Sequence, residues 1–148
     1  NQSPIGWFEP IGLTCQLVKK EIVHRIKVAA RHPVYENYRT SLYQMLMQRL
    51  SYEHADRQTL LWQLGELMYL CHASYNACHL GSTATDELVK RVKEKQRKGM
   101  GVYGAKITGG GSGGTVVVLC DGERGLETAH QIARSYGNEQ AMNLVFFD

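Results

Sequence analysis

The sequence predicts an α+β domain in which helices pack on one face of a small antiparallel sheet. Two observations support this prediction. Apolar residues recur at spacings of three and four along several stretches between residues 38 and 136, which is the period of an amphipathic helix. Between the last two of these stretches, two runs of strand-forming residues flank a glycine-rich segment. Helices enclosing an antiparallel hairpin indicate the α+β class.

The first part of the chain is expected to be irregular and then extended. Residues 1–21 contain two of the three prolines and lack sustained periodicity, so we interpret them as an entering segment before a domain over residues 22–148. Apolar and polar side chains alternate over residues 22–28, which predicts a strand with one solvated face. Pro33 disfavours helical backbone at His32 and favours a helix that starts just after it.

Two helices are predicted next. The first is marked by an apolar stripe of Tyr38, Leu42, Met45, Leu46 and Leu50. The second is longer and is marked by Leu60, Leu64, Leu67, Cys71, Tyr75 and Cys78. The neighbours of Tyr69 and Tyr75 on this helix are mainly apolar, so we expect both rings in the core.

A third helix is predicted to start at a capping box formed by Thr83 and Asp86. Its apolar stripe consists of Leu88, Val89 and Val92, and Gly99 and Gly101 are expected to end it. The stripe of a fourth helix consists of Leu126, Ala129, Ile132, Ala133 and Tyr136. Residues 143–147 are predicted to form a last strand.

The most informative segment is the glycine loop, in which five of the six residues from Gly109 to Gly114 are glycine. Glycine at this density costs backbone entropy, so a folded domain keeps it where the backbone needs a positive φ or a close approach to a ligand. Main-chain N–H groups in such a loop favour an anion, above all phosphate.

Two familiar phosphate-binding loops do not fit this segment. The glycines meet the G-x-G-x-x-G spacing, but that fingerprint needs a following helix, and residues 115–119 are strand-forming. The P-loop places its lysine after the glycines, whereas Lys106 precedes them. A strand–loop–strand hairpin remains, with Lys106 and Thr108 at its entrance. A plain connector between two strands is the alternative interpretation.

The segment Gly-Ala-Lys-Ile-Thr-Gly-Gly-Gly-Ser-Gly-Gly at residues 104–114 resembles the third conserved motif of the GHMP kinases, which include galactokinase, homoserine kinase and mevalonate kinase. Residues 30–39 resemble the segment that opens the C-terminal domain of sugar kinases in this family. Residues 64–89 are most similar to plant-type L-arabinokinases, with galactokinase the nearest competitor. The resemblance covers roughly residues 22–147 and implies a ferredoxin-like GHMP kinase C-terminal domain.

This resemblance implies that a preceding N-terminal domain binds most of the ATP and Mg²⁺ and contributes any catalytic aspartate. Its Pro-x-x-x-Gly-Leu-Ser-Ser-type stretch does not occur here, and the chain starts at Asn1, so we interpret the sequence as a fragment that is inactive alone. The phosphate and substrate loop would consist of Thr108, Gly109, Gly110, Gly111, Ser112 and Gly113. Backbone amides would make the main contacts, with hydroxyl groups from Thr108 and Ser112, whereas Lys106 is expected to be structural.

The implied function is that of an ATP-dependent sugar-1-kinase whose monosaccharide is L-arabinose or galactose. No residue pair in this chain forms a nucleophile–base set, so no catalytic residue is assigned to it, and a hydrolase is disfavoured. A non-catalytic sugar sensor, or a degenerate kinase that has kept the fold, is the alternative. An intact serine-rich phosphate loop upstream of Asn1 would favour the enzyme.

Composition excludes several other classes of function. The 148 residues are 43% hydrophobic and 21% charged, as in ordinary globular domains, and the net charge of +3 is too small to indicate nucleic acid. No apolar run is long enough to cross a membrane, and no signal-peptide pattern opens the sequence. The four cysteines show no disulfide framework, so we expect reduced thiols and a cytoplasmic protein.

Each of two clusters of polar residues has a structural and a functional interpretation. Cys71-His72 and Cys78-His79 suggest zinc, but seven residues on one helix separate the cysteines by roughly 10 Å, too far for one ion. We therefore expect core cysteines, partly exposed histidines and no metal site. A second cluster, comprising His32, Tyr35, Glu36 and Arg39, is interpreted either as a helix-start network or as a substrate contact.

Overall fold

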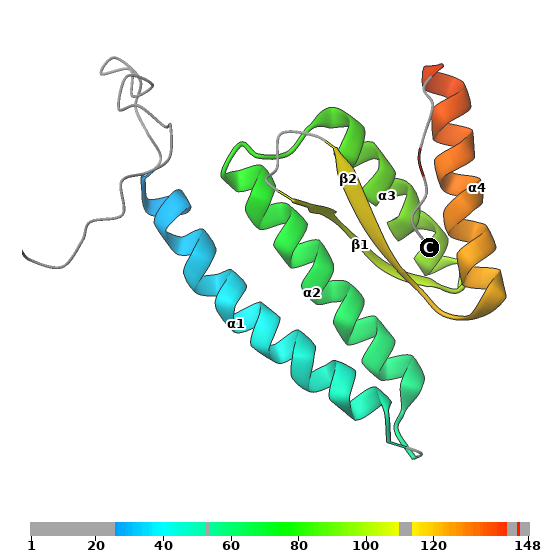
Figure 1. Cartoon of the computed structure of the whole chain (residues 1–148), viewed down its shortest axis with the longest axis horizontal. Coiled ribbons are helices and arrows are strands. Elements are labelled where there is room, and N and C mark those ends of the chain that lie inside the picture. Colours follow the sequence, from blue (N-terminus) through cyan, green and yellow to red (C-terminus); the bar gives the residue numbers. More distant parts are fainter. Residues whose placement is uncertain (1–25, 53, 110–113, 142–144, 146–148) are drawn as a thin grey trace, which may run out of the picture.

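A computed structural model of the chain describes residues 26–52, 54–109, 114–141 and 145. Its elements are α1 (Ile26–Leu50), α2 (Arg57–Ala77), α3 (Thr83–Arg97), β1 (Val102–Thr108), β2 (Thr115–Cys120) and α4 (Gly122–Gln140), as Figure 1 shows. Four helices and a two-stranded antiparallel sheet confirm the predicted α+β class. Each described helix is too short or too polar to cross a lipid bilayer.

The start of α1 differs from the sequence prediction. The helix already includes Ile26, so the strand expected over residues 22–28 is wrong for its described part. The expected start after Pro33 is also wrong, because this proline lies inside the helix. A proline lacks the N–H that would donate to the carbonyl one turn earlier, so α1 loses one internal hydrogen bond at this position.

Contacts with the end of α2 explain why α1 nevertheless continues through Pro33. The Nδ1 atom of His32 lies 2.8 Å from the Ser74 hydroxyl, and the Cys78 thiol lies 3.9 Å from the Val28 carbonyl oxygen. Both contacts hold the first turns of α1 against α2. These tertiary contacts thus outweigh the preference of the residue before Pro33 for non-helical backbone. That preference is the only sequence signal for a helix boundary at this position.

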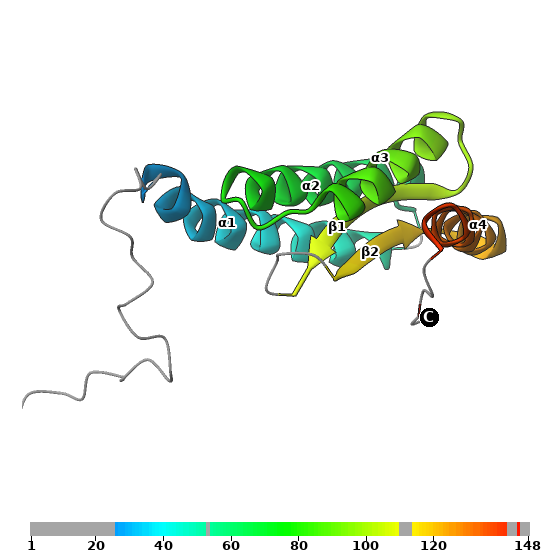
Figure 2. The ribbon, with the colours of Figure 1, turned by 90° about the horizontal axis from the view of Figure 1, so that it is seen from above.

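In the second half of α1 the predicted stripe is confirmed at Leu42, Leu46 and Leu50 and is wrong at Tyr38 and Met45, whose side chains are exposed. Leu46 is buried against Leu60 and Leu64 of α2, and Leu42 and Leu50 pack around them. Asp56 then starts α2, because its carboxylate accepts a hydrogen bond from the Thr59 N–H at 3.2 Å. The helix predicted from the longer stripe is thereby confirmed. In Figures 1 and 2, α1 and α4 lie on opposite sides of the hairpin.

The backbones of α2 and β1 approach each other closely. A Cβ atom added at Gly65 would lie 1.8 Å from the Tyr103 carbonyl oxygen, and one added at Gly104 would lie 2.5 Å from the Gly65 Cα atom. Helix and strand backbones therefore touch, which requires glycine at both positions. Two turns further along α2, His72 Nδ1 accepts a hydrogen bond from the Ile107 N–H at 3.3 Å. In this way α2 covers the edge of β1 that β2 does not pair with.

The hairpin itself is confirmed. β1 and β2 pair antiparallel, with Lys106 opposite Val117 and Ile107 opposite Val116. One face of this sheet carries a buried core that joins α2, α3, β1 and α4. The members of this core are Tyr69, Val89, Val92, Val102, Ala105 and Ile132. The prediction that Tyr69 is a core residue is therefore confirmed.

The capping box of α3 is shifted by one residue from the prediction. Ser82 is the N-cap, and its hydroxyl accepts a hydrogen bond from the Thr85 N–H at 3.2 Å while Thr85 bonds back to the Ser82 N–H. The predicted Thr83 and Asp86 pair is wrong because Asp86 points to α2 instead, where it accepts a hydrogen bond from Asn76 at 2.7 Å. Gly99, with φ of +66°, follows the C-cap of α3, as predicted.

The fourth predicted helix is confirmed as α4, and an ion pair links it to α3. The Arg91 guanidinium donates a hydrogen bond to the Glu139 carboxylate at 2.9 Å. The Arg91 guanidinium and, to a smaller extent, the Ser135 hydroxyl lower the pKa of Glu139 from 4.5 to about 2. The predicted last strand over residues 143–147 lies outside the described residues, apart from Val145, which is in no strand.

Gly65→Ala tests the contact between the α2 and β1 backbones. The added methyl group forces α2 away from β1, and overpacking of this kind costs up to about 3 kcal/mol. Alanine regains about 1 kcal/mol of helix propensity, so we expect a net loss of about 2 kcal/mol in the free energy of unfolding. Urea unfolding followed by circular dichroism measures the change. The neighbouring exposed Glu66→Ala is the control, with a change within about 0.5 kcal/mol. A Gly65→Ala protein as stable as the wild type would contradict the contact.

Glu139→Gln tests the α3–α4 ion pair through its pH dependence. The folded-state pKa of Glu139 is lowered, so its contribution to stability is present above the unfolded value of 4.5 and is lost as the pH falls towards about 2. The variant should melt below the wild type at pH 7, and the difference should vanish over that acidic range. Glu94→Gln, an exposed carboxylate on α3, is the control. A melting difference that does not change with pH would contradict the pairing.

Candidate functional site

The glycine loop joins β1 to β2 at one end of the hairpin (Figure 1). Of the predicted loop residues, the structure describes Thr108 and Gly109, whereas residues 110–113 lie outside the described part. Gly109 has a φ of +80° and Gly114 a φ of +113°, and no atom lies within 4 Å of a Cβ built at either position. Backbone conformation, rather than lack of space, therefore requires glycine at both ends of the loop.

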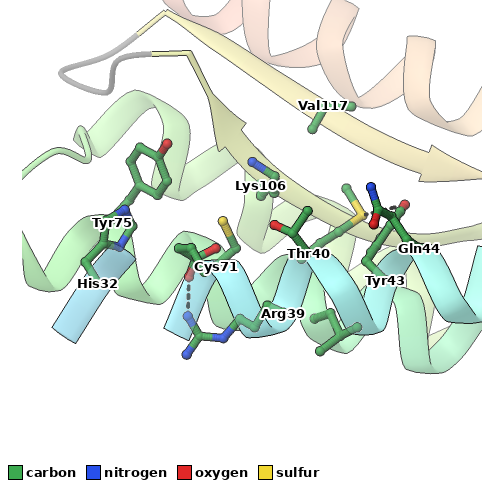
Figure 3. A pocket seen from close by; sticks show the side chains of 12 residues that line it. His32, Arg39, Thr40, Tyr43, Gln44, Cys71, Tyr75, Lys106 and Val117 are labelled. Atoms are coloured by element: carbon green, nitrogen blue, oxygen red, sulfur yellow. Dashed lines mark hydrogen bonds and ion pairs between the residues drawn. The ribbon is translucent and has the colours of Figure 1, made fainter. Parts of the chain in front are cut away.

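A cavity of about 460 Å³ lies beside this loop, between α1, α2 and the hairpin (Figure 3). The side chains that α1 contributes are mainly polar and follow helical spacing: His32, Glu36, Arg39, Thr40, Tyr43 and Gln44. The contribution of α2 is mainly apolar: Leu67, Met68, Cys71 and Tyr75. Lys106 and Val117 reach it from the paired strands. The cavity therefore combines a polar wall with an apolar wall, as small-molecule sites do.

Hydrogen bonds connect the cavity to the start of the loop. The Tyr75 hydroxyl donates to the Gly109 carbonyl oxygen at 3.3 Å, and the Lys106 ammonium donates to the Ile107 carbonyl oxygen at 3.0 Å. The Tyr75 ring also packs edge-on against His32, with 4.9 Å between ring centroids. The expectation that Tyr75 is a core residue is wrong, because its hydroxyl reaches the loop and the side chain stays partly exposed.

The charges around the cavity are unevenly neutralised. Glu36 and Arg39 form an ion pair with each other, and each side chain is about one-fifth exposed. Burial raises the pKa of the Cys71 thiol to about 11, with a further rise from Glu36, so this cysteine stays protonated at neutral pH. A protonated thiol is a poor nucleophile. The arrangement is therefore suited to binding and orienting a ligand rather than to covalent catalysis.

The predicted polar cluster on α1 is divided by the structure. His32, Glu36 and Arg39 line the cavity, whereas Tyr35 lies outside that set and accepts a hydrogen bond from Arg31 at 3.0 Å. The helix-start interpretation is wrong because α1 begins at Ile26. Thr40 and Gln44 were not singled out from the sequence. Their spacing of four and eight residues from Glu36 is the signal that would have placed them on the same helix face.

The two cysteine–histidine pairs differ in burial, and the prediction of core cysteines is wrong for Cys78, which is only partly buried, while its neighbour His79 is exposed. Cys71 is buried, as expected, but His72 is buried too, which contradicts its predicted partial exposure. The reason is that its Nδ1 accepts from the Ile107 N–H while its Nε2 lies 3.0 Å from an Asp86 carboxylate oxygen. Within the described residues, no group of three or more His, Cys, Asp and Glu side chains is placed to hold a metal ion.

Comparisons with known proteins identify a family that this chain resembles. The family model described as GHMP kinases C terminal matches residues 60–139, from α2 to α4. The chain is 44% identical to L-arabinokinase of Arabidopsis thaliana over 114 residues, which cover 74% of this chain and 10% of that protein. It is 35% identical to mevalonate kinase of Saccharolobus solfataricus over 74 residues, which cover 50% of this chain and 20% of that protein.

The match therefore spans a tenth to a fifth of the length of these relatives. The family model nevertheless covers more than half of the chain and includes the contact between α2 and β1, the hairpin and both strands that flank the glycine loop. The chain belongs to the GHMP kinase family and corresponds to the C-terminal domain of its members.

Proposed function

We propose that this chain is the C-terminal domain of an ATP-dependent sugar-1-kinase that phosphorylates the anomeric hydroxyl of L-arabinose or galactose. The observation that supports this most directly is the identity of 44% to an L-arabinokinase over 74% of the chain. The glycine loop adds physical support, because its described ends, Gly109 and Gly114, adopt positive φ and carry no side chain that would cover a ligand.

In this proposal the loop from Thr108 to Gly113 lies against the phosphates and the sugar. Phosphoryl transfer needs positioning and stabilisation of negative charge more than covalent chemistry. Backbone N–H groups supply both without any change of protonation, and hydroxyl groups from Thr108 and Ser112 would add further hydrogen bonds. The bond from Tyr75 to Gly109 would hold the start of the loop on α2.

The donors of this chain suit phosphate oxygens better than a metal ion. Glycine amides and the Lys106 ammonium are hydrogen-bond donors, whereas Mg²⁺ needs oxygen ligands such as carboxylates, which the described residues do not gather in one place. When bound, ATP supplies the phosphoryl group, and Mg²⁺ neutralises the phosphate charge. We therefore assign phosphate contacts to residues 108–113 and assign Mg²⁺ and most of the ATP site to a preceding N-terminal domain.

A substrate panel tests the reaction. We expect the full-length protein that carries this domain, supplied with ATP and Mg²⁺, to release ADP with L-arabinose or galactose and not with mevalonate. The 148-residue chain alone should give no sugar-dependent ADP release, because the ATP site is assigned to the other domain. A coupled ADP assay measures both. Binding of sugar without any turnover by the full-length protein would favour the non-catalytic sensor. Turnover of mevalonate alone would contradict the sugar-kinase assignment.

Gly111→Val tests the glycine loop in the full-length protein. The substitution adds a branched side chain at the centre of the segment that we propose to face the phosphates, so kcat should fall by about 100-fold or more. The matched control is Gly99→Val, which also replaces a glycine with a large side chain but at the end of α3, where φ is +66°. The control should lower the melting temperature and leave kcat within about threefold of the wild type. Near-normal turnover of Gly111→Val would show that the loop is a plain connector.

A further inference from the structure

The Lys106 side chain is the feature of the cavity that lacks an opposing charge. It is partly buried, and its ammonium donates to the Ile107 carbonyl oxygen and lies 5.7 Å from the centroid of the Tyr75 ring. Among the residues that the structure describes, no carboxylate lies within ion-pair distance of this ammonium. A cation that is partly removed from water gains from an anion at hydrogen-bond distance.

The other charges of the cavity do not supply that anion. Glu36 is the acidic residue of the lining, and its carboxylate is paired with Arg39. Cys71 stays a neutral thiol because burial raises its pKa to about 11. With one carboxylate and two cations, the lining carries a net charge of +1 when His32 is neutral. The surplus positive charge therefore lies at Lys106.

Figure 3 shows Lys106 near the middle of the cavity, with His32 and Tyr75 on one side of it and Tyr43 and Gln44 on the other. The apolar part of the lining is the wall that Leu67 and Met68 of α2 form, where the Tyr43 hydroxyl lies 4.0 Å from the sulfur of Met68. Figure 3 also shows the Cys71 thiol directed into the space below Lys106. A ligand that matches this lining has an anionic group near Lys106 and an apolar body against Leu67 and Met68.

We propose that this cavity binds an organic anion, a phosphate or carboxylate carried on an apolar or ring-shaped body, with Lys106 as the residue that binds the charged group. The volume of about 460 Å³ falls within the usual range for small-molecule sites. The Thr40 hydroxyl and the Gln44 amide offer further donors from α1. This site lies beside the glycine loop and does not depend on the kinase reaction proposed above.

Lys106 is a better anchor for the anion than Arg39. The guanidinium of Arg39 is already neutralised by Glu36, so a ligand would have to break an ion pair to use it. Lys106 is held by neutral groups, among them the carbonyl oxygen of Ile107 and the Tyr75 ring, and a charged acceptor forms a stronger bond with an ammonium than a carbonyl does. A bound anion would thereby replace the hydrogen bond from the Lys106 ammonium to the carbonyl oxygen of Ile107, the residue before Thr108.

The test is a titration of the 148-residue chain followed by amide chemical shifts in NMR. The probes are phenyl phosphate, benzoate, the neutral benzyl alcohol and inorganic phosphate. We expect at least one of the two aromatic anions to bind with a Kd of about 1 mM or tighter, and to shift the amides of Lys106 and Ile107 but not that of Glu139. Whichever of phenyl phosphate and benzoate binds more tightly identifies phosphate or carboxylate as the charged group that the cavity prefers. Benzyl alcohol and inorganic phosphate should each bind at least about tenfold more weakly.

Two variants change the charge of the cavity in opposite directions. Lys106→Met keeps much of the side-chain volume and should weaken the aromatic anion at least about tenfold, whereas Lys106→Arg should stay within about threefold of the wild type. Glu36→Gln removes the negative charge and frees Arg39, so it should tighten binding. Lys90→Met, an exposed lysine of α3, is the control and should change nothing.

Several results would overturn the proposal. They are the absence of binding by both aromatic anions, equal binding of benzyl alcohol, or unchanged affinity in Lys106→Met. The Lys106→Arg and Glu36→Gln variants keep the test decisive if Lys106→Met fails to fold. Weakened binding in Glu36→Gln would likewise contradict the assignment, because it would show that the carboxylate attracts the probe.

Discussion

The rest of the structure depends on the contact between the backbones of α2 and β1 at Gly65 and Gly104. Because the helix lies directly on the strand edge there, His72 reaches the Ile107 N–H two turns later. One further turn along α2, Tyr75 reaches the carbonyl oxygen of Gly109. A single close approach thus aligns α2 with β1 up to the point where the glycine loop begins. In the kinase that we propose, alignment of this kind would position the loop for phosphoryl transfer.

Helix α1 turns polar side chains inward and exposes apolar ones along much of its length, unlike an ordinary surface helix. Its polar residues face α2 and the hairpin across the cavity. Several of its apolar residues point outward instead, with exposed fractions of 68% for Val34, 66% for Tyr38 and 50% for Met45. Polar groups on an inner surface cost free energy unless they are hydrogen-bonded or bind a ligand. The pairing of Glu36 with Arg39 and of His32 with Ser74 satisfies part of this requirement, and Lys106 leaves a positive charge for a ligand.

The chemistry of this cavity is that of binding rather than of bond making. It contains a protonated thiol, an internal ion pair and an ammonium, and none of these is an activated nucleophile. The two ends of the glycine loop, at Gly109 and Gly114, need positive φ whatever the loop contacts.

Local patterns in the sequence determined the order and type of most elements. The stripes of α2 and α4, the hairpin and the end of α3 at Gly99 follow from residues that are neighbours along the chain, because periodicity and backbone preference act over one or two turns. The glycine motif also identified the family before any contact was known. Tertiary contacts decided the rest. α1 passes through Pro33 because its first turns bind the distant end of α2. His72 is buried because Ile107 and Asp86, 35 and 14 residues away in sequence, converge on its ring. The cavity exists because three separate elements meet around it, and no pattern within one element encodes such a meeting.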